Sequence, residues 1–312
     1  MIARGHTRIG GRPVDAARLA AGNMEVTLLS YGAITRDWRI GGRSIVLGYD
    51  DPADYGDDPY FVGVIAGRVA NRIAGGRFML DGMAVDLPLN DGPNHLHGGP
   101  RGLGKRFWEM EEDSGANSVR LTCVSGHGDG GYPGRARFEV VVRLSETRLT
   151  YEIRAEVDRP TPINLAQHNY YNLTGGSLAG HELQIAAAEA LAVDAGGIPT
   201  GKRLAIADTP LDFRTTRALG EPVPQADLCM VLSGAEPAAV LSAPGAPTLS
   251  FFTDQPGLQL YTGEHLGGRF RPYSGLCLEP EAFPDAVNHP GFAPIITFPE
   301  APYFQRLSIE VA

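Results

Sequence analysis

The sequence has few of the features that mark membrane-spanning or nucleic-acid-binding proteins. No run approaches the roughly 18 consecutive apolar residues that a membrane-spanning helix needs. Basic residues are the minority among the charged ones, 27 against 36 acidic residues, and the formal net charge is −9. We therefore expect neither a nucleic acid nor a membrane as a partner, because both attract basic proteins.

Cysteine is also scarce, and it is not arranged as a metal site or a disulfide framework. The three cysteines, Cys123, Cys229 and Cys277, lie far apart and form no CxxC pair. An odd number of separated thiols is typical of buried cysteines in a reducing compartment. The first residues, MIARGHTRIGGRP, hold no apolar run of the kind that directs secretion. The sequence thus predicts a cytoplasmic protein.

Long helices are not expected, because glycine (40) and proline (24) are abundant among the 312 residues. Either residue inside a helix costs about 1–3 kcal/mol. Apolar residues instead recur at every second position, most clearly over residues 135–158, which predicts an antiparallel hairpin with one buried face. Residues 184–195 are rich in alanine and fit either a short helix or a strand. Many short strands between Gly/Pro turns predict an all-β fold, a sandwich or barrel.

No Pro/Ser-rich linker and no internal repeat divides the chain, so we expect a single domain over residues 1–312. The hydrophobic fraction of 43% is enough to build a large core.

Three motifs resemble ligand sites but lack their usual context. Residues 126–131 match GxGxxG, yet Tyr132-Pro133 follows instead of a helix. Residues 99–105 match GxxxxGK, but Arg106 stands where a phosphate loop has Ser or Thr. His95 and His97 would share a face of a strand and could grip a metal, although no third ligand lies nearby in the sequence. The alternative for the histidine pair is a polar loop.

Polar residues gather in four clusters at expected strand ends: residues 67–73, 94–99, 164–175 and 278–288. Together they supply amides, arginines, aromatic rings, histidines and carboxylates. This combination suits a neutral polyol, since amides and guanidinium groups pair with hydroxyls and aromatic rings pack on C–H faces.

These clusters closely resemble the aldose 1-epimerase (galactose mutarotase) family. The matching stretches are GRVANRIAGGRF, NHLHGGPRGLGKRFW, GDGGYPG, TPINLAQHNYYNLTG, LQLYTGEHL and LCLEPEAFPDAVNHP, in the family's order. The resemblance spans residues 20–312. It implies a large antiparallel β-sandwich with an open sugar cleft, no cofactor and no metal. It also implies a free aldose, such as glucose, galactose or a pentose, as the small-molecule partner. We expect a monomer or a homodimer.

The resemblance further implies three catalytic residues. Glu279 aligns with the family's catalytic base, and His168 aligns with its general acid. His97 is similar to the histidine that hydrogen-bonds near the ring oxygen. Mutarotation opens a hemiacetal ring and recloses it with C1 inverted, so one group must remove a proton from the C1 hydroxyl while another protonates the ring oxygen.

Four further positions match sugar-binding residues of the family: Asn71, Arg72, Asp227 and Gln259. The base must be ionised, so we expect Glu279 to lie near donors such as Arg72.

Glu281 stands where many family members have Gln. We expect its side chain to face away from the cavity or to pair with a cation. The two-residue spacing also allows it to face the same cavity as Glu279, in which case like-charge repulsion would raise the pKa of one of the two. Two alternative functions stay open: a non-catalytic sugar-binding relative, and a glycoside-cleaving enzyme that uses Glu279 with Asp227 as its paired carboxylates.

Overall fold

The structure, a computed structural model, describes residues 1–312 and consists almost entirely of β-strands. Its helical segments are six short 3-10 turns: η1 (Pro52–Asp57), η2 (Ala74–Gly76), η3 (Leu103–Lys105), η4 (Asp129–Gly131), η5 (Leu178–Gly180) and η6 (Ala286–Asn288). No helix is long and apolar enough to cross a membrane. The all-β prediction is confirmed.

Three antiparallel sheets contain most of the strands. The five-stranded sheet has the order β1 (Ile2–Ile9), β2 (Arg12–Ala21), β3 (Met24–Leu29), β4 (Ile34–Ile40) and β5 (Arg43–Ser44). The nine-stranded sheet has the order β11 (Glu109–Asp113), β12 (Ser118–Ser125), β13 (Ala136–Leu144), β14 (Arg148–Val157), β28 (Tyr303–Val311), β24 (Leu249–Thr253), β23 (Ala239–Ser242), β18 (Glu182–Ile185) and β21 (Arg217–Ala218).

The six-stranded sheet has the order β17 (Tyr170–Tyr171), β26 (Leu276–Glu281), β25 (Gly257–Tyr261), β22 (Asp227–Leu232), β19 (Ala187–Val193) and β20 (Pro199–Ala205). Four short pairs complete the fold: β6 (Ile65–Ala66) with β16 (Ala166–Gln167), β7 (Arg72–Ile73) with β10 (His95–Leu96), β8 (Arg77–Leu80) with β9 (Met83–Asp86), and β15 (Thr161–Pro162) with β27 (Ile296–Thr297).

The predicted hairpin at residues 135–158 is strands β13 and β14, in register from Ala136↔Val157 to Leu144↔Leu149. Its alternate apolar residues are buried and its intervening charged residues are not. The alanine-rich stretch at 184–195 is not a helix but the end of β18 followed by β19. Pairing of β19 with β20 on one side and β22 on the other places it inside a sheet, which overrides the helix propensity of alanine.

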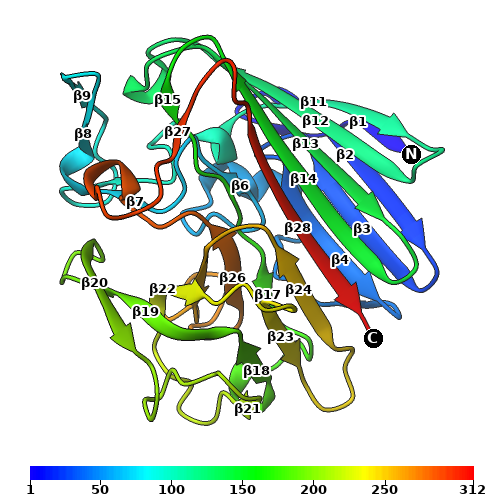
Figure 1. The fold of residues 1–312 in the computed structure, drawn as a ribbon. Coiled ribbons are helices and arrows are strands. Elements are labelled where there is room, and N and C mark those ends of the chain that lie inside the picture. The colour runs from blue at the N-terminus through cyan, green and yellow to red at the C-terminus, as the bar shows by residue number, and fades with distance from the viewer.

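One hydrophobic core joins the three sheets. A single cluster of 52 buried residues includes side chains from all of them, for example Val26 of β3, Val140 of β13 and Leu260 of β25. In Figure 1 the blue strands β1–β4 lie behind the green strands β11–β14, and β2 contacts β12 and β13. Strand β28 runs between β14 and β24 and so links the two halves of the nine-stranded sheet. The single domain over residues 1–312 stays a prediction.

The GxGxxG stretch at residues 126–131 has a structural role. It forms turn η4, which leads to strand β13 rather than to a helix. The buried Arg68 guanidinium donates to the carbonyl oxygens of Ser125, Gly126, Pro133 and Gly134. This arginine therefore ties the glycine-rich turn to the segment that carries Asn71 and Arg72.

Candidate active site

One cavity of about 250 Å³ gathers all seven residues that the sequence analysis selected as catalytic or sugar-binding. Its walls come from segments far apart in the chain. The lining residues are Pro59, Tyr60, Phe61, Asn71, Arg72, Leu96, His97, His168, Tyr170, Asp227, Gln259, Tyr261, His265 and Glu279. The fold thus brings the predicted residues together, while their individual roles stay predictions.

Three neighbouring strands of the six-stranded sheet form one side of the cavity. Gln259 on β25 lies opposite Glu279 on β26 in the ladder, and Gln259 Nε2 donates to Asp227 Oδ1 on β22 at 2.6 Å. Gln259 is 5% exposed, and its Oε1 has no hydrogen-bond partner. An unpaired buried acceptor costs about 1–3 kcal/mol.

His168 and Glu279 are buried next to each other, with His168 Nε2 and Glu279 Oε2 3.7 Å apart. Burial lowers the pKa of His168 to about 4, so its ring is neutral at neutral pH. Burial, with the negative charges of Glu281 and Asp227, raises the pKa of Glu279 well above its usual value. The carboxyl group therefore holds its proton more tightly than a free glutamate does.

The other ring nitrogen of His168 contacts a thiol: Nδ1 lies 3.5 Å from Cys277 Sγ. Cys277, His168 and Glu279 are thus close enough together to suggest metal ligands. One possible ligand atom from each of the three residues lies within 4.8 Å of the other two, so the groups form a compact cluster.

His97 is held by the backbone of Asn71. The Asn71 amide donates to His97 Nδ1 at 3.1 Å, and the His97 amide donates to the Asn71 carbonyl at 3.0 Å. Since Nδ1 is an acceptor, the neutral ring carries its proton on Nε2. Burial is the main cause that holds the pKa of His97 well below its usual value, and the neighbouring His168 adds to it. His97 therefore offers a neutral N–H donor.

Arg72 does not lie against Glu279, and that expectation is wrong. Its Nε binds Asp91 Oδ2 at 2.7 Å, and its Nη1 lies 3.5 Å from Asp227 Oδ2. The guanidinium group is thereby held between two carboxylates at the edge of the cavity. Glu279 has no hydrogen-bond donor from the protein, which is consistent with its raised pKa.

Glu281 does not line the cavity, in agreement with one of the two expectations for it. The other expectation, an ion pair with a cation, is wrong because Glu281 forms none. Its side chain is not turned to solvent either. Its side chain is buried, 1% exposed, and its Oε1 accepts a hydrogen bond from Asn71 Nδ2 at 3.1 Å.

The metal hypothesis for His95 and His97 is wrong, because the two rings do not share a face. His95 is completely buried, with Nδ1 2.7 Å from the Pro88 carbonyl and Nε2 2.8 Å from the Tyr132 hydroxyl. His97 has a positive φ of 49°, which ends the strand alternation after Leu96 and turns its ring to the cavity. His95 is a structural residue.

Four aromatic residues that were not among the predicted site residues also line the cavity: Tyr60, Phe61, Tyr170 and Tyr261. Phe61 has a φ of 58° and packs on His97 with ring centroids 4.6 Å apart. Asp58 holds this turn by accepting the amides of Tyr60 and Val62. Tyr170 and Tyr261 lie in quoted motifs, whereas nothing local in the sequence marks Tyr60 and Phe61.

Comparison with known proteins decides the family. The sequence model described as aldose 1-epimerase matches residues 15–310. The chain belongs to the aldose 1-epimerase family. It is 37% identical to galactose mutarotase of Rattus norvegicus, with 94% of this chain and 93% of that protein covered. It is 36% identical to aldose 1-epimerase of Escherichia coli (strain K12), with 86% and 85% covered.

Solved structures of aldose 1-epimerase relatives share the whole fold. The galactose 1-epimerase of Lactobacillus acidophilus superposes with a TM-score of 0.91 at 28% identity, covering 100% of this chain and 98% of that one. An aldose epimerase homologue from C. elegans gives 0.90 at 29% identity, covering 95% and 98%. The sandwich implied by the family resemblance is therefore confirmed.

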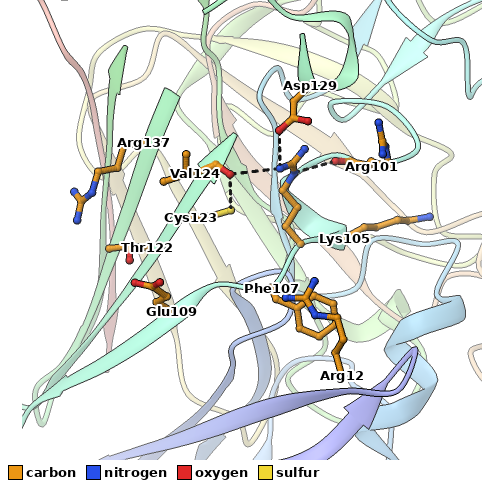
Figure 2. Close-up of a pocket in the computed structure, with 11 residues that line it drawn as sticks. Arg12, Arg101, Lys105, Phe107, Glu109, Thr122, Cys123, Val124, Asp129 and Arg137 are labelled. Carbon is orange, nitrogen blue, oxygen red and sulfur yellow. Dashed lines mark hydrogen bonds and ion pairs between the residues drawn. The ribbon is translucent and has the colours of Figure 1, made fainter. Parts of the chain in front are cut away.

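A second hollow, of about 470 Å³, holds none of the residues selected for the epimerase site. Figure 2 shows its basic lining. Arg106 binds Asp129 at 3.0 Å and the carbonyl oxygens of Arg101 and Val124, while Lys105 and Arg137 extend on opposite sides. All seven predicted site residues line the smaller cavity instead, so that cavity is the candidate active site.

Proposed function

We propose that this chain interconverts the α and β anomers of a free aldose, with Glu279 and His168 exchanging protons with the anomeric centre. Glucose, galactose and a pentose are the candidate sugars. The observation that carries the proposal is the buried carboxyl–imidazole pair, whose facing atoms are 3.7 Å apart in a cavity lined by hydroxyl-binding groups.

Ring opening needs two proton transfers at one carbon. Ionised Glu279 takes the proton of the C1 hydroxyl, a C1=O bond forms, and the bond between C1 and the ring oxygen breaks. Protonated His168 gives its Nε2 proton to that ring oxygen. Both oxygens are bonded to C1, so two neighbouring groups can each reach one of them. Rotation about the C1–C2 bond and reversal of both transfers gives the other anomer. Each positioned transfer contributes roughly 10²–10⁴ in rate.

For this reaction, Glu279 and His168 must together hold one ionisable proton. A carboxylate beside an imidazolium is the state that starts the reaction, and a carboxylic acid beside a neutral imidazole has the same number of protons. The lowered pKa of His168 and the raised pKa of Glu279 favour the second form in the empty site. Transfer of one proton from Glu279 to His168, whose facing atoms are 3.7 Å apart, would produce the first form without exchange with solvent.

Hydroxyl recognition is proposed for the residues around this pair. His97 would donate its Nε2 proton near the ring oxygen, and Gln259, which lines the cavity, would bind a hydroxyl group. Arg72, Asn71 and Asp227 would bind further hydroxyl groups. A single neutral hydrogen bond of this kind contributes about 0.5–1.5 kcal/mol.

Polarimetry on freshly dissolved α-glucose, α-galactose and α-xylose tests the proposal. We expect faster approach to the equilibrium rotation than in buffer for at least one sugar. No acceleration with any of them would contradict the proposed activity and favour the non-catalytic sugar-binding alternative. Release of the aglycone from an aryl glycoside would favour the glycoside-cleaving alternative.

A further inference from the structure

A second carboxyl group lies buried behind the catalytic one. Glu281 follows Glu279 by two residues on β26, so both side chains leave the same face of the sheet. The residue opposite Glu281 on β25 is Gly257, which has no side chain to cover the Glu281 carboxyl group. Glu281 is 1% exposed and does not line the cavity. The mechanism proposed above does not use it.

The surroundings of Glu281 are mostly acidic or neutral. The ionisable groups close enough to interact electrostatically with it are Glu279 on its own strand, Asp227 and Cys229 on β22, Tyr303 on β28 and one cation, Arg72 on β7. Arg72 is bound by Asp91 and Asp227. The hydrogen bond that Glu281 receives comes from Asn71 Nδ2. Burial raises the pKa of Glu281 to about 8.

We infer that Glu281 is a positioning residue of the reaction: it holds the Asn71 side chain and, when it ionises, keeps a proton on the neighbouring Glu279. The inference rests on the proposed function. Glu281 touches no substrate in this arrangement and acts through two residues that line the cavity.

The order of ionisation follows from the hydrogen bonds. Asn71 donates to Glu281, whereas no protein group donates to Glu279, so Glu281 releases its proton first. Its new negative charge then makes loss of the Glu279 proton less favourable, since two nearby carboxyl groups titrate as one coupled system. The Glu279–His168 pair thereby keeps its one proton to a higher pH.

The Asn71 contact gives Glu281 its second role. The Asn71 backbone fixes His97, and the Asn71 side-chain oxygen accepts from the Arg72 amide. The hydrogen bond to Glu281 fixes the remaining end of the Asn71 amide group. Loss of that bond would release a side chain that lines the cavity.

Glu281→Gln removes the negative charge of Glu281 but keeps its contact with Asn71, because glutamine has an oxygen that accepts the Asn71 hydrogen bond. We expect kcat at the optimum within about threefold of the parent value. The alkaline limb of the kcat/KM profile should move at least half a pH unit toward lower pH, and the acid limb should stay in place. Glu189→Gln, a remote half-exposed carboxylate on β19, is the matched control and should move neither limb. An alkaline limb that coincides with the parent's, or that moves to higher pH, would overturn the inference.

Carbon-13 NMR of the glutamate carboxyl groups tests the coupling without turnover. In the parent protein two buried carboxyl signals should each respond to the other's titration, and in Glu281→Gln the Glu279 signal should titrate at lower pH. Independent single-step curves, or an unmoved Glu279 signal, would overturn the inference even if the chain had no mutarotase activity. Absence of activity in the parent would instead contradict the proposed function.

Glu281→Leu tests the contact with Asn71. Leucine cannot accept the Asn71 hydrogen bond, so we expect KM for the best sugar to rise at least fivefold above that of Glu281→Gln. An equal KM in the two variants would show that the contact does not position Asn71.

Discussion

At the scale of single residues, Glu279 is unusual because no protein donor stabilises its charge. Burial and two neighbouring carboxylates raise its pKa, which is suited to a group that must take up and release a proton in each cycle. Burial also lowers the pKa of His168, to about 4.

Glu279→Gln should reduce kcat by about 10²–10⁴, because an amide of the same size cannot accept the C1 proton. KM should change by less than about threefold, since the glutamine still fits. Polarimetry gives both constants, and circular dichroism confirms the fold. Retention of more than about a tenth of kcat would move the base to another residue.

His97→Ala should mainly weaken sugar binding. The ring is a neutral donor whose pKa lies well below its usual value, so it does not titrate in the working range. We expect KM to rise about 5–100-fold, corresponding to roughly 1–3 kcal/mol, with the limbs of the pH profile unmoved. A limb displaced by this substitution would show that His97 carries a proton in the reaction.

At the scale of elements, the sequence predicted the strands well and the turns between them poorly. Alternation of apolar residues identified β13 and β14, because that pattern is local. The same rule failed for His95 and His97, because the positive φ of His97 depends on a distant contact between its loop and Asn71. The site residues were selected from the family resemblance, while the partners of Arg72 and Glu281 come from strands far apart in the chain and could not be predicted.

Gly98 makes that loop possible. It has a φ of 82°, and a Cβ there would lie 1.8 Å from the Gly67 carbonyl oxygen. Gly98→Ala should therefore displace the His97 backbone, lower kcat/KM at least tenfold and destabilise the fold by about 2 kcal/mol or more. Chemical denaturation and polarimetry measure the two effects.

Gly92→Ala is the control for that substitution. Gly92 also has a positive φ, 56°, but a Cβ there meets nothing within 4 Å. The cost should be about 1 kcal/mol, from backbone strain alone, with kcat/KM unchanged. Equal losses in the two variants would show that the contact with Gly67 is unimportant.

At the scale of the whole molecule, the buried carboxyl groups make folding depend on pH. A carboxyl whose pKa is higher in the folded chain stabilises the fold fully only below its unfolded value, near 4.5. That contribution is lost as the pH rises through the folded value, which for Glu281 is about 8.

The free energy of unfolding of Glu281→Gln, minus that of the parent, should therefore increase from pH 4.5 to pH 8 and level off above it. The increase should be on the order of 2–5 kcal/mol. Urea denaturation at half-unit pH steps measures it. A difference that is constant across this range would show that Glu281 titrates normally in the folded protein.

Three adjacent strands carry Asp227, Gln259 and Glu279, so main-chain hydrogen bonds fix the spacing of these groups. Other lining residues lie in turns and bends, including Tyr60 and His97. Loops tolerate substitution and insertion better than ladders do. Exchanging the lining residues in these turns can therefore change the preferred sugar while the residues on β22, β25 and β26 keep their spacing. A search for new specificities should start at the turns.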